Sequence, residues 1–292
     1  MAWVQIRFPV EKPHVDEISD LLMELGSVSV TFTANDDEAI FELYPGDKKI
    51  WLISTCVGLF DASTDMQHIA NVLKNQAMFE QGFHYKIEQV EDKDWEREWM
   101  DNFHPIKFGE RLWVCPSWRD IPDPAACNVI LDPGLAFGTG THATTALCLE
   151  WLEGMDLTDK TVMDFGCGSG ILAIAELKLG AKRAIGIDID PKAITASLEN
   201  AERNGVADQI ELYLPEDAPE FDTDIILANI LAGPLKELKQ IICGYGHTGT
   251  QLALSGILAE QTEGINDAYK ELVNLNPITQ KEEWVRVDGL IK

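Results

Sequence analysis

Residues 162–170 read V-M-D-F-G-C-G-S-G, and this stretch decides the fold of the chain. Its first four residues predict the end of an apolar strand, and glycines spaced G-x-G-x-G follow. Because glycine lacks a Cβ, such a turn lets a ligand lie directly against the main chain. An apolar helix is expected over residues 171–179 and a second strand over residues 184–189. Together these elements form a βαβ unit, which predicts an α/β fold with a doubly wound parallel sheet.

Two aspartates end the second strand, and their neighbours separate their roles. Asp190 directly precedes Pro191, and an acid before a proline is an N-cap signature, here for a helix over residues 192–204. Asp188 lies at the carboxyl end of the strand, where doubly wound folds place an acid that accepts hydrogen bonds from ribose hydroxyls. The sequence therefore predicts a ribose-binding role for Asp188 and a structural role for Asp190.

The glycine spacing narrows the choice of ligand. The dinucleotide fingerprint is G-x-G-x-x-G, which differs from the spacing in this chain, and no G-x-x-x-x-G-K-[ST] loop for a triphosphate occurs. A ligand with a ribose but no phosphate points to S-adenosylmethionine, and residues 164–170 resemble motif I of the class I methyltransferases. For the glycines alone, a plain strand-to-helix turn is the alternative.

Residues 132–145 form a second candidate ligand-binding segment. Three glycines, four threonines and Phe137 precede an apolar helix that runs through Trp151. We expect a polar loop that covers the ligand and offers amide donors to a carboxylate, such as that of a methionine moiety. For His142, a capping or packing role is favoured over that of a general base.

Asn229 is the candidate for handling an acceptor group. It ends a buried strand over residues 224–228, at the expected switch point of the sheet. An asparagine carbonyl can accept the hydrogens of an amine and so aim its lone pair. Taken alone, Asn229 could equally serve only to turn the chain into a helix over residues 234–242. Glu216 and Asp217 are candidates for contacting an adenine, although a solvated loop is the favoured interpretation.

Length and composition restrict the number of domains, the location of the protein and the state of its cysteines. A length of 292 residues favours two domains. The chain has no run of eighteen apolar residues and no signal-peptide pattern at its N-terminus, so we expect a cytoplasmic protein without a membrane span. Six cysteines without a C-x-x-C pair predict reduced thiols and no metal site.

The net charge of −26 bears on partners. Phosphate binding needs a positive face, so direct nucleic-acid binding is not expected. A basic protein partner would be steered favourably. Acidity that serves solubility or a saline habitat explains the composition equally well.

Residues 1–90 are predicted to form a small separate domain. The expected elements are a strand at 3–8, a helix at 15–25, strands at 27–33 and 50–59, a helix at 66–78 and a strand at 84–90. This βαββαβ order predicts an α+β ferredoxin-like domain. Its histidines, His14, His68 and His84, are isolated and form no catalytic group.

A linker region is predicted over residues 91–110. Trp95, Trp99 and Phe103 recur every four residues, which predicts an amphipathic helix that docks on a domain. Residues 111–292 then form the cofactor-binding domain, with a seven-stranded sheet.

Residues 132–145, 164–170 and the stretch N-I-L-A-G at 229–233 together resemble the ribosomal protein L11 methyltransferase family, over essentially the whole chain. The resemblance implies a class I methyltransferase Rossmann-like sheet and a small N-terminal domain that binds the substrate protein. It implies S-adenosylmethionine as cofactor, with contacts at Thr145, Gly166, Asp188 and Asn229. The amide chemistry of Asn229 makes this residue the catalytic candidate. The implied reaction is N-methylation of lysine side chains and of the N-terminal α-amine of ribosomal protein L11. We expect a monomer.

The sequence also departs from the family at one position, and two rival functions stay open. Ala143 stands where many members have proline, which should loosen the turn slightly. A glutamine or adenine amino-methyltransferase of the same fold usually carries N-P-P-Y where this chain has N-I-L-A. A non-catalytic sensor or assembly factor would keep Asp188 but would not need Asn229.

Overall fold

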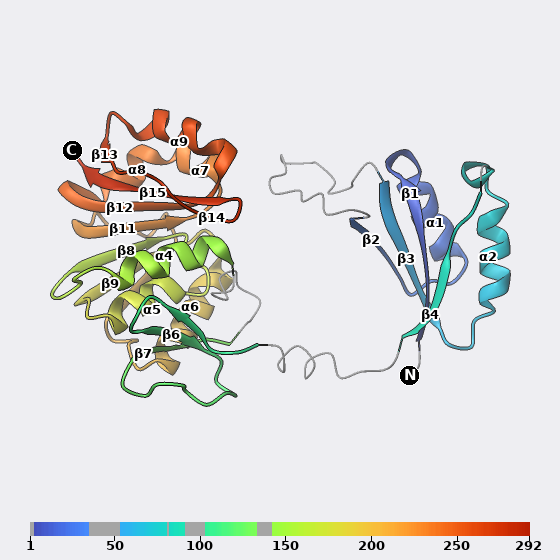
Figure 1. The fold of residues 1–292 in the computed structure, drawn as a ribbon, viewed down its shortest axis with the longest axis horizontal. Helices are drawn as coiled ribbons and strands as arrows, with labels where there is room; N and C mark the ends of the chain where they lie inside the picture. Colours follow the sequence, from blue (N-terminus) through green and yellow to red (C-terminus); the bar gives the residue numbers. More distant parts are fainter. Residues whose placement is uncertain (1–2, 35–52, 81, 91–102, 133–141) are drawn as a thin grey trace. The chain divides into compact units, whose positions relative to one another are not determined.

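The computed structural model describes residues 3–34, 53–80, 82–90, 103–132 and 142–292. The chain divides into two compact units, Met1–Met100 and Asp101–Lys292 (Figure 1). The helix expected around Trp95 and Trp99 lies outside the described residues. Phe103 is described, and its ring centroid lies 6.3 Å from that of Trp118 within the larger unit. The assignment of roles to residues 1–90, 91–110 and 111–292 stays a prediction.

The smaller unit is a four-stranded antiparallel sheet with two helices packed on one face (Figure 1). Its elements are β1 Trp3–Glu11, α1 Val15–Glu24, β2 Ser29–Ala34, β3 Ile53–Asp61, α2 Met66–Lys74 and β4 Lys86–Val90. The sheet order is β2-β3-β1-β4. This is the βαββαβ order predicted from the sequence, and the order of the strands is that of a ferredoxin-like domain.

Buried and exposed residues alternate along β1, which explains why α1 and α2 cover a single face of the sheet. Val4, Ile6, Phe8 and Val10 are buried, whereas the intervening residues point away from the core. The buried residues pack with Ile18 and Leu22 of α1 and with Ile69 and Leu73 of α2. β1 continues three residues past the predicted end at Phe8, because its pairing with β3 runs on to Glu11.

The larger unit is built on an eight-stranded sheet of order β10-β9-β8-β11-β12-β15-β13, with β14 paired to β15 (Figure 1). The strands are β8 Thr161–Phe165, β9 Arg183–Ile187, β10 Ile210–Tyr213, β11 Thr223–Asn229, β12 Gly246–Leu258, β13 Val273–Leu275, β14 Thr279–Lys281 and β15 Trp284–Ile291. The first five strands along this order are parallel, and β15 is antiparallel to its neighbours. The doubly wound sheet is confirmed, with β14 added to the seven strands predicted.

Helices cover both faces of this sheet. They are α4 Ala143–Glu153, α5 Ile171–Lys178, α6 Pro191–Arg203, α7 Ala232–Glu237, α8 Lys239–Gly244 and α9 Thr262–Tyr269. Alternate residues of the central strands enter different cores: Val162 and Leu227 pack with α4 and α5, whereas Met163 and Ile226 pack with α7, α8 and α9. Both faces of the parallel strands are therefore buried, as such strands require.

One local expectation needs correction. One helix was expected over residues 234–242, but the chain forms α7 and α8, because Leu238 at φ −93° and ψ 6° leaves the helical conformation between them. Residues 106–108, at the end of the predicted linker region, form the first strand of a small separate sheet in the larger unit. Its strands are β5 Ile106–Phe108, β6 Leu112–Cys115 and β7 Cys127–Ile130.

Within the described part of the chain, no helix is long and apolar enough to cross a lipid bilayer. The same residues contain no cluster of three or more His, Cys, Asp or Glu side chains that could hold a metal ion.

Candidate functional site

Three of the predicted site residues lie together at the carboxyl edge of the parallel sheet. β11, β8 and β9 are adjacent, and their pairing runs in register to Ala228, Phe165 and Ile187. The residues that follow these positions are Asn229, Gly166 and Asp188. The fold therefore brings them to one edge of the sheet, next to its switch point, where ligands bind in doubly wound folds.

The glycine turn after β8 takes a conformation that excludes side chains. Gly166, Gly168 and Gly170 have φ of 82°, 54° and 77°, in the left-handed region that favours glycine. The amide of Gly166 donates to the Ile187 carbonyl at 2.7 Å, which ties the turn to the end of β9. A Cβ added at Gly166 would lie 2.3 Å from Cγ2 of Ile230, so this position cannot carry a larger residue without a shift.

Asp188 is oriented by the glycine turn itself. Its Oδ2 accepts from the amide of Gly168 at 2.9 Å, and its Oδ1 accepts from the amide of Asp190 at 2.9 Å. Each carboxylate oxygen has two lone pairs, so each keeps one for a ligand. Asp190 caps α6, because its Oδ1 accepts from the amide of Lys192 at 2.9 Å. The structure thus confirms the capping role of Asp190, and the ribose-binding role of Asp188 stays a prediction.

Thr145 joins the site from the first turn of α4. The side-chain amide of Asn229 donates to the hydroxyl of Thr145 at 3.3 Å. Thr145 is fully buried, whereas Asn229 is half-buried. No described residue donates to Oδ1 of Asn229, so this carbonyl is available to accept hydrogens from a bound group.

The N-terminus of α4 is fixed by His142. Its Nδ1 accepts from the amide of Thr144 at 3.4 Å and lies 2.8 Å from the Thr144 hydroxyl. Its ring also packs edge-on against Trp284, with centroids 5.0 Å apart. His142 therefore has the capping role that was predicted. The preceding residues 133–141, which hold most of the predicted covering loop, lie outside the described residues.

Two buried carboxyl groups lie behind the glycine turn. Oδ2 of Asp164 accepts from the amide of Ala173 at 3.3 Å, and Oδ1 has no partner among the described residues. Burial raises the pKa of Asp164 to about 7. Glu176 is fully buried on α5, and burial together with nearby Asp164 raises its pKa well above the usual value. Sequence reasoning missed Glu176, although a single acid within an otherwise apolar helix was a usable signal.

Sequence reasoning also missed Ser255 and Gly256. The pairing of β12 with β15 shifts register between Leu254 and Ile257, which marks an irregularity at these two residues. The hydroxyl of Ser255 donates to the carbonyl of Thr144 at 3.0 Å. The signal was a glycine within an apolar strand, since such a glycine indicates a bulge or a close approach of main chains.

Glu216 and Asp217, the candidates for an adenine contact, are exposed in a turn after β10. The structure gives them no contact with Asp188 or with the glycine turn. Their proposed role stays a prediction.

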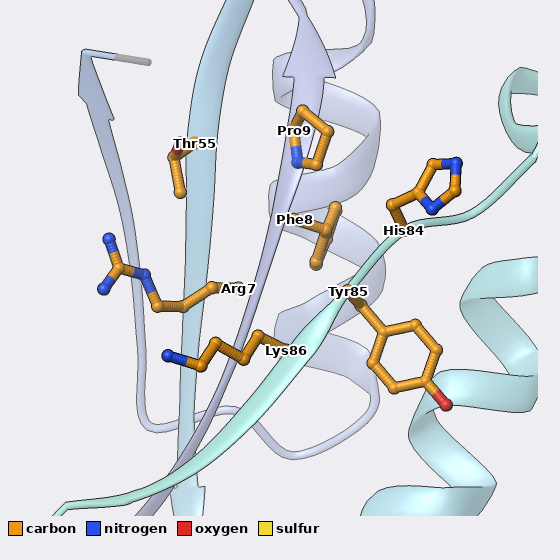
Figure 2. Close-up of a pocket in the computed structure, with 7 residues that line it drawn as sticks. All are labelled: Arg7, Phe8, Pro9, Thr55, His84, Tyr85 and Lys86. Atoms are coloured by element: carbon orange, nitrogen blue, oxygen red, sulfur yellow. The ribbon is translucent and has the colours of Figure 1, made fainter. Parts of the chain in front are cut away.

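The smaller unit has a pocket of about 280 Å³, lined by Arg7, Phe8, Pro9, Thr55, His84, Tyr85 and Lys86 (Figure 2). Figure 2 shows that Arg7 and Lys86 point to the same side, away from Tyr85. Both cations pair with Glu88, Arg7 at 3.7 Å. The carboxylate of Glu88 therefore balances one of the two positive charges beside this pocket.

The fold and the site define a class of protein. In the doubly wound sheet, β15 lies antiparallel between β12 and β13. The glycine turn follows β8, and Asp188 and Asn229 lie at the ends of β9 and β11. This combination is characteristic of a class I methyltransferase.

Comparisons with known proteins narrow this class. The family model described as "Ribosomal protein L11 methyltransferase (PrmA)" matches residues 2–291. The ribosomal protein L11 methyltransferases of Salmonella newport (strain SL254) and Salmonella typhimurium are each 60% identical over 290 residues, 99% of this chain and 99% of theirs. The crystal structure of a ribosomal protein L11 methylase from Lactobacillus delbrueckii subsp. bulgaricus has a TM-score of 0.60 at 35% identity and covers 65% of this chain and 100% of that one. The chain belongs to the ribosomal protein L11 methyltransferase family.

Proposed function

We propose that this protein transfers methyl groups from S-adenosylmethionine to lysine side chains and to the N-terminal α-amine of ribosomal protein L11. The observation that carries the proposal is the contact between Asn229 and Thr145 at 3.3 Å, which leaves Oδ1 of Asn229 open next to the glycine turn. Membership of the family supports the choice of substrate.

The residues at the sheet edge fit the cofactor. Gly166 and Gly168 form a turn with left-handed φ at the sheet edge, and the oriented carboxylate of Asp188 has a lone pair on each oxygen for a ribose hydroxyl. Thr145, Gly166, Asp188 and Asn229 are the residues that would hold the cofactor. When bound, S-adenosylmethionine supplies an electrophilic methyl group.

Asn229 would orient the acceptor amine through its free carbonyl oxygen. It cannot serve as a strong base, so the amine must arrive neutral or lose its proton to solvent. At pH 7, deprotonation costs roughly 4 to 5 kcal/mol for a lysine side chain and about 1 kcal/mol for an α-amine. The α-amine therefore starts with an advantage, and burial of the lysine at the site would reduce its handicap by disfavouring the charged form.

The two units would divide recognition from chemistry. We assign residues 1–90 to binding of L11, residues 91–110 to a linker and residues 111–292 to cofactor binding and methyl transfer. The net charge of −26 would steer a basic protein toward the enzyme and oppose direct binding of nucleic acid. We further propose that the protein acts as a monomer in the cytoplasm.

Mass spectrometry of purified L11, incubated with this protein and S-adenosylmethionine, tests the proposal. We expect mass increments of whole methyl groups that map to lysine residues and to the N-terminus, and a smaller extent of methylation when Asn229→Ala replaces the enzyme at equal time. Unmodified L11 in the presence of enzyme that binds the cofactor would reject L11 as the substrate.

A further inference from the structure

Ile230, which follows Asn229, contacts two glycines: Gly166 in the turn after β8 and Gly256 in β12. Its side chain lies over Gly166, where an added Cβ would be 2.3 Å from Cγ2. Its carbonyl faces Gly256, where an added Cβ would be 2.2 Å from the oxygen and 2.8 Å from the carbonyl carbon. A Cβ at Gly166 would collide with the side chain of Ile230, and a Cβ at Gly256 would collide with its main chain, so neither glycine can be replaced unless Ile230 shifts.

Gly256 is held in place by a local irregularity of β12. Asn229 pairs with Ser255 in register, and the pairing of β12 with β15 shifts directly afterwards. Gly256 has φ of 82°, so the chain turns there in a conformation that side chains disfavour. Bulges of this kind redirect a strand next to functional sites.

Ser255, which pairs with Asn229, also forms a hydrogen bond to α4. It is fully buried, and its hydroxyl donates to the carbonyl of Thr144 at 3.0 Å. The next residue of α4, Thr145, accepts the hydrogen bond from Asn229. β12 therefore contacts the main chain next to both members of the Asn229–Thr145 hydrogen bond. Gly256 contacts the residue after Asn229, and Ser255 bonds to the residue before Thr145.

The geometry points to Ser255 and Gly256 as positioning residues that set the place of the Asn229 amide relative to Thr145 and to the glycine turn. Neither residue touches the reacting groups. The inference rests on the proposed function in one respect, since it gives Asn229 the task of orienting the acceptor amine. A displacement of about 1 Å in such a group can lower the rate on the order of a hundredfold.

Two glycine variants distinguish the effect of displacing Asn229 from the effect of backbone strain alone. Gly256→Ala places a Cβ against Ile230. Gly249→Ala serves as its control, because Gly249 lies in the same strand with φ of 95° and an added Cβ there meets nothing within 4 Å. Both variants place an alanine at a positive φ, which strains the backbone to a similar degree. Only Gly256→Ala should displace Ile230 and, with it, Asn229.

A second pair tests the serine. Ser255→Ala removes the hydrogen bond to Thr144. Thr223→Val is its control, since the hydroxyl of Thr223 is equally buried and donates to the carbonyl of Tyr245 at 2.9 Å, at the amino end of β11. If Gly256→Ala fails to fold, the comparison of Ser255→Ala with Thr223→Val decides the question.

The experiment has two measurements on the full chain. The first records the side-chain amide signals of Asn229 by NMR without cofactor or substrate, assigned from their loss in Asn229→Ala. The second measures kcat and KM for methylation of L11 at saturating S-adenosylmethionine. We expect Gly256→Ala and Ser255→Ala to shift the Asn229 signals and to lower kcat about tenfold or more, with KM for L11 unchanged. The controls should change neither.

Asn229 signals that stay in place in both Gly256→Ala and Ser255→Ala would overturn the inference, as would equal losses of kcat in the variants and their controls. The NMR measurement does not depend on the substrate. If the unaltered protein fails to methylate L11 while the Asn229 signals shift as expected, the proposed function fails and the positioning role stands.

Discussion

The side-chain amide of Asn229 donates to the hydroxyl of Thr145 at 3.3 Å, although the two residues are 84 positions apart in the sequence. The contact fixes which end of the Asn229 amide faces the protein, and so leaves the carbonyl end for a ligand. It also links the first turn of α4 to the end of β11. The orientation of Asn229 therefore depends on a residue that would not itself touch the acceptor amine.

Thr145→Val should lower the rate of methyl transfer about fivefold, because it removes the acceptor for the Asn229 amide, a hydrogen bond worth on the order of 1 kcal/mol. Thr145→Ser keeps the hydroxyl and should retain most of the activity. Steady-state rates at saturating cofactor measure both. Equal activity of the valine and serine variants would show that the contact does not orient Asn229.

Asp188→Ala should weaken binding of S-adenosylmethionine by about 1.5 to 3 kcal/mol, the range for hydrogen bonds to a charged group. Isothermal titration calorimetry gives the affinity directly. Asp190→Ala is the matched control, since it removes the cap of α6 at the next acid along the chain and should lower stability without a comparable loss of affinity. An unchanged affinity in folded Asp188→Ala would reject the ribose-binding role.

The local chemistry of the sequence was enough to predict much of this site. Asp188 and Asp190 were separated by the proline that follows Asp190, and the glycine turn was marked by its spacing. The same reasoning could not predict the contact of Gly256 with Ile230, because that contact depends on how β11 and β12 pair. Glu176 was missed although it is the single acid of an otherwise apolar helix, and its burial near Asp164 depends on how α5 packs on the sheet.

Stability should fall as pH rises from about 4, owing to the buried carboxyl groups. Burial raises the pKa of Asp164 from 3.8 to about 7, so the folded protein keeps a proton that the unfolded chain releases. The free energy of unfolding then declines between these two pKa values and levels off above the folded one for this group. Glu176, whose pKa is raised well above 4.5, extends the decline.

Glu176→Gln should reduce this pH dependence, since glutamine matches the neutral acid in shape and cannot ionise. At pH 5 the variant should be close to the unaltered protein in stability, and at pH 8 it should be the more stable of the two. Urea unfolding at both pH values measures the difference. If Glu176→Gln differs from the unaltered protein by the same free energy of unfolding at pH 5 and at pH 8, Glu176 does not hold a proton in the folded protein.

A fragment that lacks residues 1–90 should bind S-adenosylmethionine but fail to methylate folded L11. The larger unit has its own cores on both faces of its sheet, and the predicted cofactor contacts all lie within it. Calorimetry and mass spectrometry test the two halves of this expectation. Full activity of the fragment on L11 would remove the substrate-binding assignment of residues 1–90.

The central claim is that Asn229 orients a neutral amine for methyl transfer without removing its proton. Single-turnover rates from pH 7 to 9, on one L11 peptide with only an α-amine and one with only a lysine, test it most directly. The lysine rate should climb about tenfold per pH unit throughout, whereas the α-amine rate should level off above about pH 8. Asn229→Ala should lower both rates at every pH and leave the profiles in place. Indistinguishable profiles for the two amines, or a profile displaced by Asn229→Ala, would contradict the account.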